Sequence, residues 1–173
     1  RAAAAAFDAR IGHVEPLQRR LAELGADVRA VTRFDRRTPA SNKLRMLELA
    51  ETHEFDVLLA IDTDTVVVGD VSAYADPAAV AVKPENLDPF PPRCWRHLFA
   101  ELGLPEPSRS TVTTSTAQVT YPYFNSGVLF VPRDRCLALL ESWSKRVFDV
   151  LDLYDRRPDI VAPRQRHWTN QLS

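Results

Sequence analysis

The sequence has no excess of charge of either sign, because 22 Lys and Arg residues stand against 23 Asp and Glu residues. This balance argues against a nucleic-acid-binding protein. No apolar run approaches the length of a membrane span, so we expect no membrane-spanning segment. The two cysteines, Cys94 and Cys136, lie far apart without the spacing of a metal site. We therefore expect a reduced, cytoplasmic protein.

The length of 173 residues and the hydrophobic content of 45% are ordinary for one globular domain, and we expect a single domain over residues 1–173. Residues 2–6 predict a short helix of small residues rather than the hydrophobic region of a signal peptide. Residues 13–25 carry apolar side chains at a spacing of three to four and end in Gly25, which predicts an amphipathic helix. A strand is expected over residues 27–34.

A second helix is expected to begin at a Ser41 cap, with Leu44, Leu47 and Ala50 facing inward, and to lead into a buried strand that ends at Ile61. The order helix, strand, helix, strand is typical of βαβ units. It predicts an α/β fold, a three-layer α/β/α sandwich with a mixed, mainly parallel sheet.

The second half of the chain begins with an irregular stretch, since residues 84–107 contain six prolines. Such a stretch is either a functional loop or a plain insertion, and the sequence leaves both open. An edge strand is expected within residues 108–120, and residues 128–131 predict a second apolar strand. A long helix is expected over residues 134–154, with Trp143 in the core.

Two carboxylates, Asp62 and Asp64, follow the buried strand that ends at Ile61. Spacing i, i+2 at a strand end directs both side chains to one side, where two anions repel unless a cation lies between them. Carboxylate oxygens suit divalent hard cations such as Mg²⁺ and Mn²⁺, whose remaining coordination positions substrate phosphates often fill. The alternative is that Asp-Thr-Asp-Thr is simply a polar turn.

Three segments together resemble a known family: Asn42-Lys43-Leu44, the run from Leu59 to Asp70, and the run from Tyr123 to Val131. They are similar to the GT-A glycosyltransferases, in particular to the branch of glycogenin and bacterial lipopolysaccharide galactosyltransferases. The resemblance covers residues 41–171. It implies a sugar transfer, with retention, from a nucleotide-diphosphate-sugar donor, most simply a UDP-sugar, to an acceptor hydroxyl.

The resemblance also implies roles for individual residues. Asp62 and Asp64 would hold Mn²⁺ or Mg²⁺ against the diphosphate, and Asp62 would also approach the ribose. Lys43 would contact the donor sugar or its phosphate, although a solvated lysine is the alternative. Asn125 would bind donor or acceptor hydroxyls, and otherwise is a turn residue. Asn170 and Gln171 match the catalytic Asp-Gln pair of the family.

The chain departs from the family pattern at three places. Asn170 replaces an aspartate, and a neutral amide cannot give the same electrostatic help to a cationic sugar transition state. The family's first strand would precede His13, where residues 1–11 are rich in alanine. The usual histidine metal ligand would lie beyond the last residue, and no histidine is assigned instead. We therefore expect a sequence truncated at both ends of a larger catalytic domain.

Two other functions stay open. In a phosphatase of the haloacid dehalogenase type, Asp62 would be a nucleophile and Asp64 a general acid or base. That chemistry also needs a downstream acidic pair and a suitable lysine, and Lys145 falls inside a predicted helix. The other possibility is a non-catalytic module that binds nucleotide sugars, which Asn170 favours.

Overall fold

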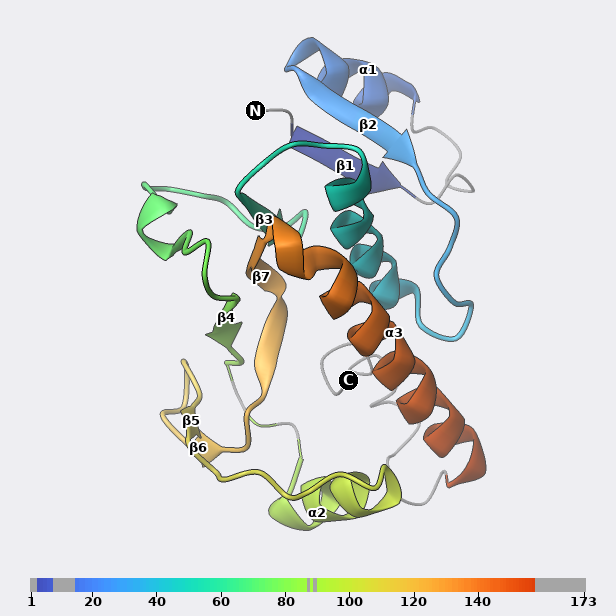
Figure 1. Cartoon of the computed structure of the whole chain (residues 1–173), viewed down its shortest axis with the longest axis vertical. Coiled ribbons are helices and arrows are strands. Elements are labelled where there is room, and N and C mark those ends of the chain that lie inside the picture. The colour runs from blue at the N-terminus through green and yellow to red at the C-terminus, as the bar shows by residue number, and fades with distance from the viewer. Residues whose placement is uncertain (1–2, 8–14, 87, 89, 158–173) are drawn as a thin grey trace.

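The computed structural model describes residues 3–7, 15–86, 88 and 90–157. Helix α1 (Glu15–Glu23) packs beside strand β2 (Ala26–Ala30), which pairs in parallel with strand β1 (Ala3–Phe7) (Figure 1). The predicted helix end is confirmed, since Gly25 follows α1 with φ at 82°, a left-handed value that suits glycine. Strand β2 confirms the expected strand but ends four residues earlier than predicted.

The alanine-rich N-terminal stretch forms β1, so the helix predicted for residues 2–6 is wrong, and alanine content does not prevent a strand there. Ala3 lies opposite Ala26 and Phe7 lies opposite Ala30. Alanine has the highest intrinsic helix propensity, but tertiary context overrides propensity routinely. Here the ladder to β2 satisfies backbone groups that an isolated five-residue helix would leave largely unpaired.

The second predicted helix is the 3-10 helix η1 (Pro39–Glu51), which begins earlier than expected. Its buried residues recur every third position: Ser41, Leu44, Leu47 and Ala50. Three residues per turn place these side chains above one another on a single face. Ser41 is inside the helix rather than at its cap, and its hydroxyl lies 3.1 Å from that of Thr38.

The central sheet has the strand order β3-β7-β4, formed by β3 (Val57–Ile61), β7 (Phe124–Pro132) and β4 (Ala81–Pro84). Both pairings are antiparallel, with Val57 opposite Pro132 and Ile61 opposite Val128. Strands β5 (Thr111–Val112) and β6 (Val119–Thr120) form an antiparallel pair where an edge strand was expected. The fold is α/β, but the mainly parallel sheet is wrong for the described strands, where β1 and β2 form the one parallel pair.

The register between β4 and β7 is irregular at the point nearest the end of β3. The partner of Val82 is Leu129, whereas the partner of the next residue, Lys83, is Asn125. Three residues of β7, 126–128, are therefore skipped by β4. Irregularities of this kind bend a strand and redirect its side chains, and they are common next to binding sites.

Helix α3 (Arg133–Arg156) confirms the long helix predicted for residues 134–154, and it runs beside η1 (Figure 1). Both helices pack on the sheet through what we term the sheet core. Its buried members come from η1, β3, β7 and α3: Leu44, Leu47, Ala50, Ala60, Leu129, Val131, Cys136, Val147 and Leu151. Trp143 packs against this core, as predicted. The packing supports an α/β fold but does not establish the expected three-layer sandwich.

A second cluster, the aromatic core, lies between α3 and helix α2 (Pro92–Glu101). Its buried members are Phe90, Trp95, Leu98, Tyr121, Tyr123, Val150, Leu153 and Tyr154. Part of the proline-rich stretch therefore folds as a helix that buries Trp95 and Leu98. Between β3 and β4 the chain forms the short 3-10 turn η2 (Ser72–Tyr74). No helix in the described part of the chain is long and apolar enough to cross a membrane.

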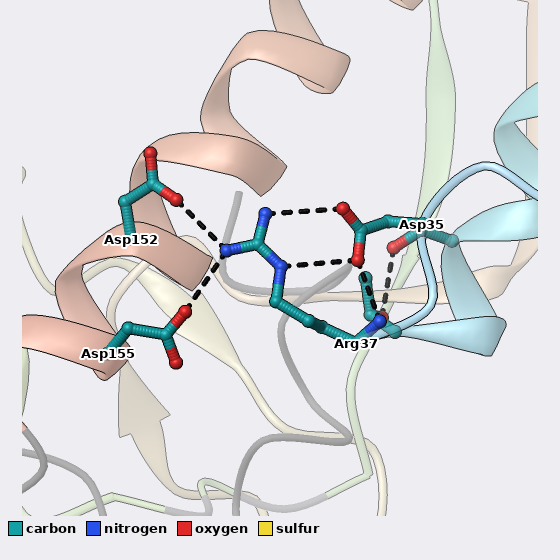
Figure 2. A network of polar contacts seen from close by, with 6 residues as sticks. Asp35, Arg37, Asp152 and Asp155 are labelled. Carbon is teal, nitrogen blue, oxygen red and sulfur yellow. Dashed lines mark hydrogen bonds and ion pairs between the residues drawn. The ribbon is translucent and has the colours of Figure 1, made fainter.

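Arg37 connects the segment after β2 to the C-terminal half of α3 (Figure 2). Its guanidinium donates to Asp35 at 3.2 Å, to Asp152 at 3.0 Å and to Asp155 at 3.1 Å. The hydrogen bond from Arg37 lowers the pKa of Asp35 below its usual value of 3.8, because it stabilises the ionised form. This contact fixes the chain just before η1 begins.

Replacing Asp35 with asparagine is expected to lower the free energy of unfolding at pH 7. A carboxyl whose pKa is lowered by folding stabilises the protein above its unfolded pKa of about 4, and this contribution is lost as the pH falls through the lower folded value. Urea unfolding of the wild type and of Asp35→Asn should therefore show a difference in the free energy of unfolding. This difference should be constant above about pH 5 and shrink below about pH 4. In an Arg37→Met background the same substitution should show much less of this pH dependence. A difference that does not change with pH would contradict the assignment.

Candidate functional site

The carboxylate pair lies in a turn at the end of β3. The Asp62 amide donates to the Gly127 carbonyl oxygen of β7 at 2.9 Å, and the Thr65 amide donates to the Asp62 carbonyl oxygen at 3.0 Å. Residues 62–65 therefore turn, as the polar-turn interpretation expected, rather than continuing as an extended strand. The apolar residues that follow are solvent-exposed, Val66 at 79% and Val68 at 94%.

The two carboxylates have different surroundings. The side chain of Asp62 is 41% exposed and is held by neighbouring residues. Asp64 is exposed, and within the described residues its side chain makes no hydrogen bond or ion pair. Asp64 therefore has carboxylate oxygens available to a ligand, whereas Asp62 is already fixed in position.

Lys43 is the cation beside Asp62. Its ammonium group lies 2.7 Å from Asp62 Oδ1 and 3.1 Å from the hydroxyl of Ser126, and the lysine side chain is only 16% exposed. This is not the solvated lysine of the alternative interpretation. A charge-assisted hydrogen bond in a partly buried place orients both partners. The structure thus brings together Lys43 from η1, Asp62 from the end of β3 and Ser126 from β7.

Gly127 makes the position of Asp62 possible. A Cβ atom on Gly127 would lie 2.7 Å from Asn125 Oδ1, 2.9 Å from Asp62 Cγ, and closer still to Asp62 Oδ2. These separations are too short for any larger residue without movement of the neighbours. The absence of a side chain at Gly127 therefore lets the Asp62 carboxylate lie against the backbone of β7.

Both the oxygen and the nitrogen of the Asn125 side-chain amide make hydrogen bonds within the protein. Its Oδ1 accepts a hydrogen bond from the Gly127 amide at 2.7 Å, and its Nδ2 donates to Glu85 at 3.2 Å. These two contacts define the orientation of the amide. Asn125 therefore stabilises the irregular part of β7 directly, and it lies within the strand rather than in a turn before it.

Glu85 is the site-adjacent residue that the sequence did not reveal. It follows β4, is 6% exposed, and accepts from the Asn86 amide at 2.7 Å as well as from Asn125. Burial, together with the charges of Glu85 and Asp88, raises the pKa of Tyr123 far above its usual value. A lone glutamate in a proline-rich stretch gives no pattern, and only the β4–β7 pairing places it beside Asn125.

The donor set fits a hard divalent cation in part. Asp62 and Asp64 supply carboxylate oxygens, which are the ligands that Mg²⁺ and Mn²⁺ prefer. Among the described residues no group of three or more His, Cys, Asp and Glu side chains is arranged to hold a metal. A cation at the turn would therefore rely on one or two carboxylates and on oxygens from water or substrate, as is common for Mg²⁺.

Asn170 and Gln171, the predicted catalytic pair, lie outside the described residues. Their position relative to the turn is not given by the structure.

A cavity of about 310 Å³ adjoins the site. It opens between the sheet and α3, and its walls come from β4, β7, the residues before β4, and one side of α3: Val80, Val82, Phe124, Asn125, Ser126, Leu129, Leu139, Ser142, Trp143 and Arg146. Asn125 and Ser126 belong both to the cavity and to the group around Asp62.

The fold and the site define an α/β protein with an acidic turn at a strand end, beside a half-buried lysine and an apolar cavity. The model of the Rhodobacterales glycosyltransferase domain family matches residues 4–173. The chain belongs to this glycosyltransferase domain family. Comparisons with curated proteins and with solved structures gave no match.

Proposed function

We propose that the protein transfers a sugar from a nucleotide-diphosphate-sugar donor, a UDP-sugar, to an acceptor hydroxyl. Membership of the glycosyltransferase domain family supports the reaction class. The observation that carries the choice of donor is the turn at Asp62 and Asp64 beside Lys43. Carboxylates that share a site with a cation suit a metal-bridged diphosphate better than a neutral ligand.

Asp62 and Asp64 would hold Mn²⁺ or Mg²⁺, and the bound cation would stabilise the negative charge that develops on the diphosphate leaving group. Asp64, whose side chain is exposed, would contribute most of the protein's coordination. Lys43, which already contacts Asp62 and Ser126, would also donate a hydrogen bond to a phosphate of the donor.

Two further roles come from the family resemblance. Asn125 would offer its remaining amide hydrogen to a hydroxyl of donor or acceptor, because its oxygen and one side of its nitrogen are already engaged. Asn170 and Gln171 would hydrogen-bond to the reacting sugar. The resemblance also supports the GT-A architecture, the glycogenin-like branch and transfer with retention.

A non-catalytic module that binds nucleotide sugars is the second candidate, and the asparagine at position 170 favours it. It shares the donor site and differs only in turnover. Family membership argues against the phosphatase alternative, in which Asp62 would be a nucleophile.

We expect the purified protein to bind UDP in the presence of Mn²⁺ and to lose this binding when EDTA removes the metal. With UDP-glucose or UDP-galactose and Mn²⁺, it should release UDP by slow hydrolysis, and faster when an acceptor is present. Isothermal titration calorimetry measures the binding, and a coupled assay for UDP measures turnover. Binding without UDP release would support the module instead, and no metal-dependent binding of UDP would contradict the donor site.

A further inference from the structure

We propose that the apolar cavity between the sheet and α3 binds the apolar part of the acceptor, an aryl or alkyl group linked to the hydroxyl-bearing portion. This inference rests on the proposed function and names the acceptor class that the same site would use. Nothing in the family assignment specifies an acceptor.

The cavity shares two residues, Asn125 and Ser126, with the group around Asp62. Ser126, which is 4% exposed, lines the cavity and lies 3.1 Å from the Lys43 ammonium, which in turn contacts Asp62. Asn125 also lines the cavity. A molecule that fills the cavity therefore places its polar end beside Asn125 and Ser126, within the group of residues around the carboxylate turn.

The walls of the cavity select an apolar group. Most of the lining is hydrophobic, with Phe124 and Trp143 as aromatic members and Val82, Leu129 and Leu139 as aliphatic ones. Sugar hydroxyls or a diphosphate in such surroundings would lose hydrogen bonds to water without replacement. An aryl or alkyl group has no such loss and gains from the burial of apolar surface and from packing against aromatic rings. The sugar and diphosphate parts of the donor are thus disfavoured in this cavity.

The polar residues at the α3 side of the cavity do not change this conclusion. Arg146 donates to Asp149 at 3.1 Å, a carboxylate that it shares with Lys145, so its guanidinium is held along α3. The hydroxyl of Ser142 donates to the Leu139 carbonyl oxygen at 3.2 Å. The volume of about 310 Å³ is at the lower end of the range of roughly 300–1,000 Å³ for small-molecule sites, which suits a single ring or a short chain.

A matched pair of probes tests the proposal: phenyl β-glucoside and methyl β-glucoside, which differ only in the apolar group. Binding to the whole chain is measured by saturation-transfer NMR and calorimetry in the presence of UDP and Mn²⁺. We expect phenyl β-glucoside to bind about 10-fold more tightly, which corresponds to about 1.4 kcal/mol and is modest for the burial of one ring.

Two variants of α3 locate the binding. Ser142→Trp places a large side chain at the cavity from an exposed position and should remove the preference for the phenyl group. Glu141→Trp, at the neighbouring exposed position outside the lining, should keep it. Both variants should bind UDP and Mn²⁺ like the wild type. If the wild type itself does not bind UDP, the proposed donor site has failed rather than the proposed acceptor cavity. Equal affinity for the two glucosides, or an unchanged preference in Ser142→Trp, would overturn the proposal.

Discussion

Replacement of Asp64 by alanine is expected to abolish the metal-dependent binding of UDP and to leave the fold intact. Asp64 is exposed, and its side chain makes no hydrogen bond or ion pair within the described residues, so its removal costs no packing. The proposed metal would lose a direct carboxylate ligand. Since mutation of residues that only orient a ligand costs 10–100-fold in metal affinity, we expect a loss of about 100-fold or more.

Calorimetry of UDP with Mn²⁺ measures the affinity, and circular dichroism with thermal melting reports the fold. Asp76→Ala is the control for charge, because Asp76 is an exposed aspartate in the same connection between β3 and β4, where its carboxylate accepts a hydrogen bond from the Ala78 amide at 2.7 Å. It makes the same change of charge and should leave UDP affinity unchanged. Unchanged affinity for UDP and Mn²⁺ in Asp64→Ala would refute the metal assignment.

Replacement of Gly127 by alanine is expected to damage both stability and binding. The new Cβ would lie 2.7 Å from Asn125 Oδ1 and would overlap the Asp62 carboxylate, so β7 or Asp62 has to move. The atoms that the methyl group would meet belong to side chains rather than to the backbone, so we expect a cost of about 1 kcal/mol, the low end of the range for overpacked sites. Displacement of Asp62 would also break its contact with Lys43 and weaken the binding of UDP with Mn²⁺.

Gly69→Ala provides the matched control, because a Cβ at Gly69 meets nothing within 4 Å. That variant should be neutral or slightly more stable, since alanine restricts the unfolded chain more than glycine does. Urea unfolding and calorimetry measure the two effects separately. If Gly127→Ala were as stable as Gly69→Ala and bound UDP equally well, the close approach of Asp62 to β7 would have no functional meaning.

Local patterns predicted the helices with clear periodicity. Helices α1 and α3 follow from apolar spacing, and Gly25 ends α1 as expected. Helix α2 was missed because Pro91 and Pro92 suggested irregular structure, although proline is favoured in the first turn, where its missing N–H has no helical partner. The start of η1 was misplaced for a related reason, since Pro39 occupies that first turn and Ser41 is already inside.

Direction and pairing of strands could not be derived in the same way. Val128 to Val131 were expected as a strand, but a long insert separates them from β3, so nothing local determined that they would run antiparallel to it. The site shows the same limit. Asp62, Lys43 and Asn125 were named as candidates because they belong to short motifs. The role of Glu85 depends on the pairing of β4 with β7, which has no local signal.

Helix α3 takes part in both hydrophobic clusters, and this has a consequence for how the protein unfolds. It gives Cys136, Val147 and Leu151 to the sheet core, and Val150, Leu153 and Tyr154 to the aromatic core. Fraying of the helix from either cluster would expose residues of the other within one turn. The sheet core and the aromatic core are therefore expected to unfold in one cooperative step. A substitution that disrupts the packing of α2 should then also destabilise the part of α3 that forms the cavity wall.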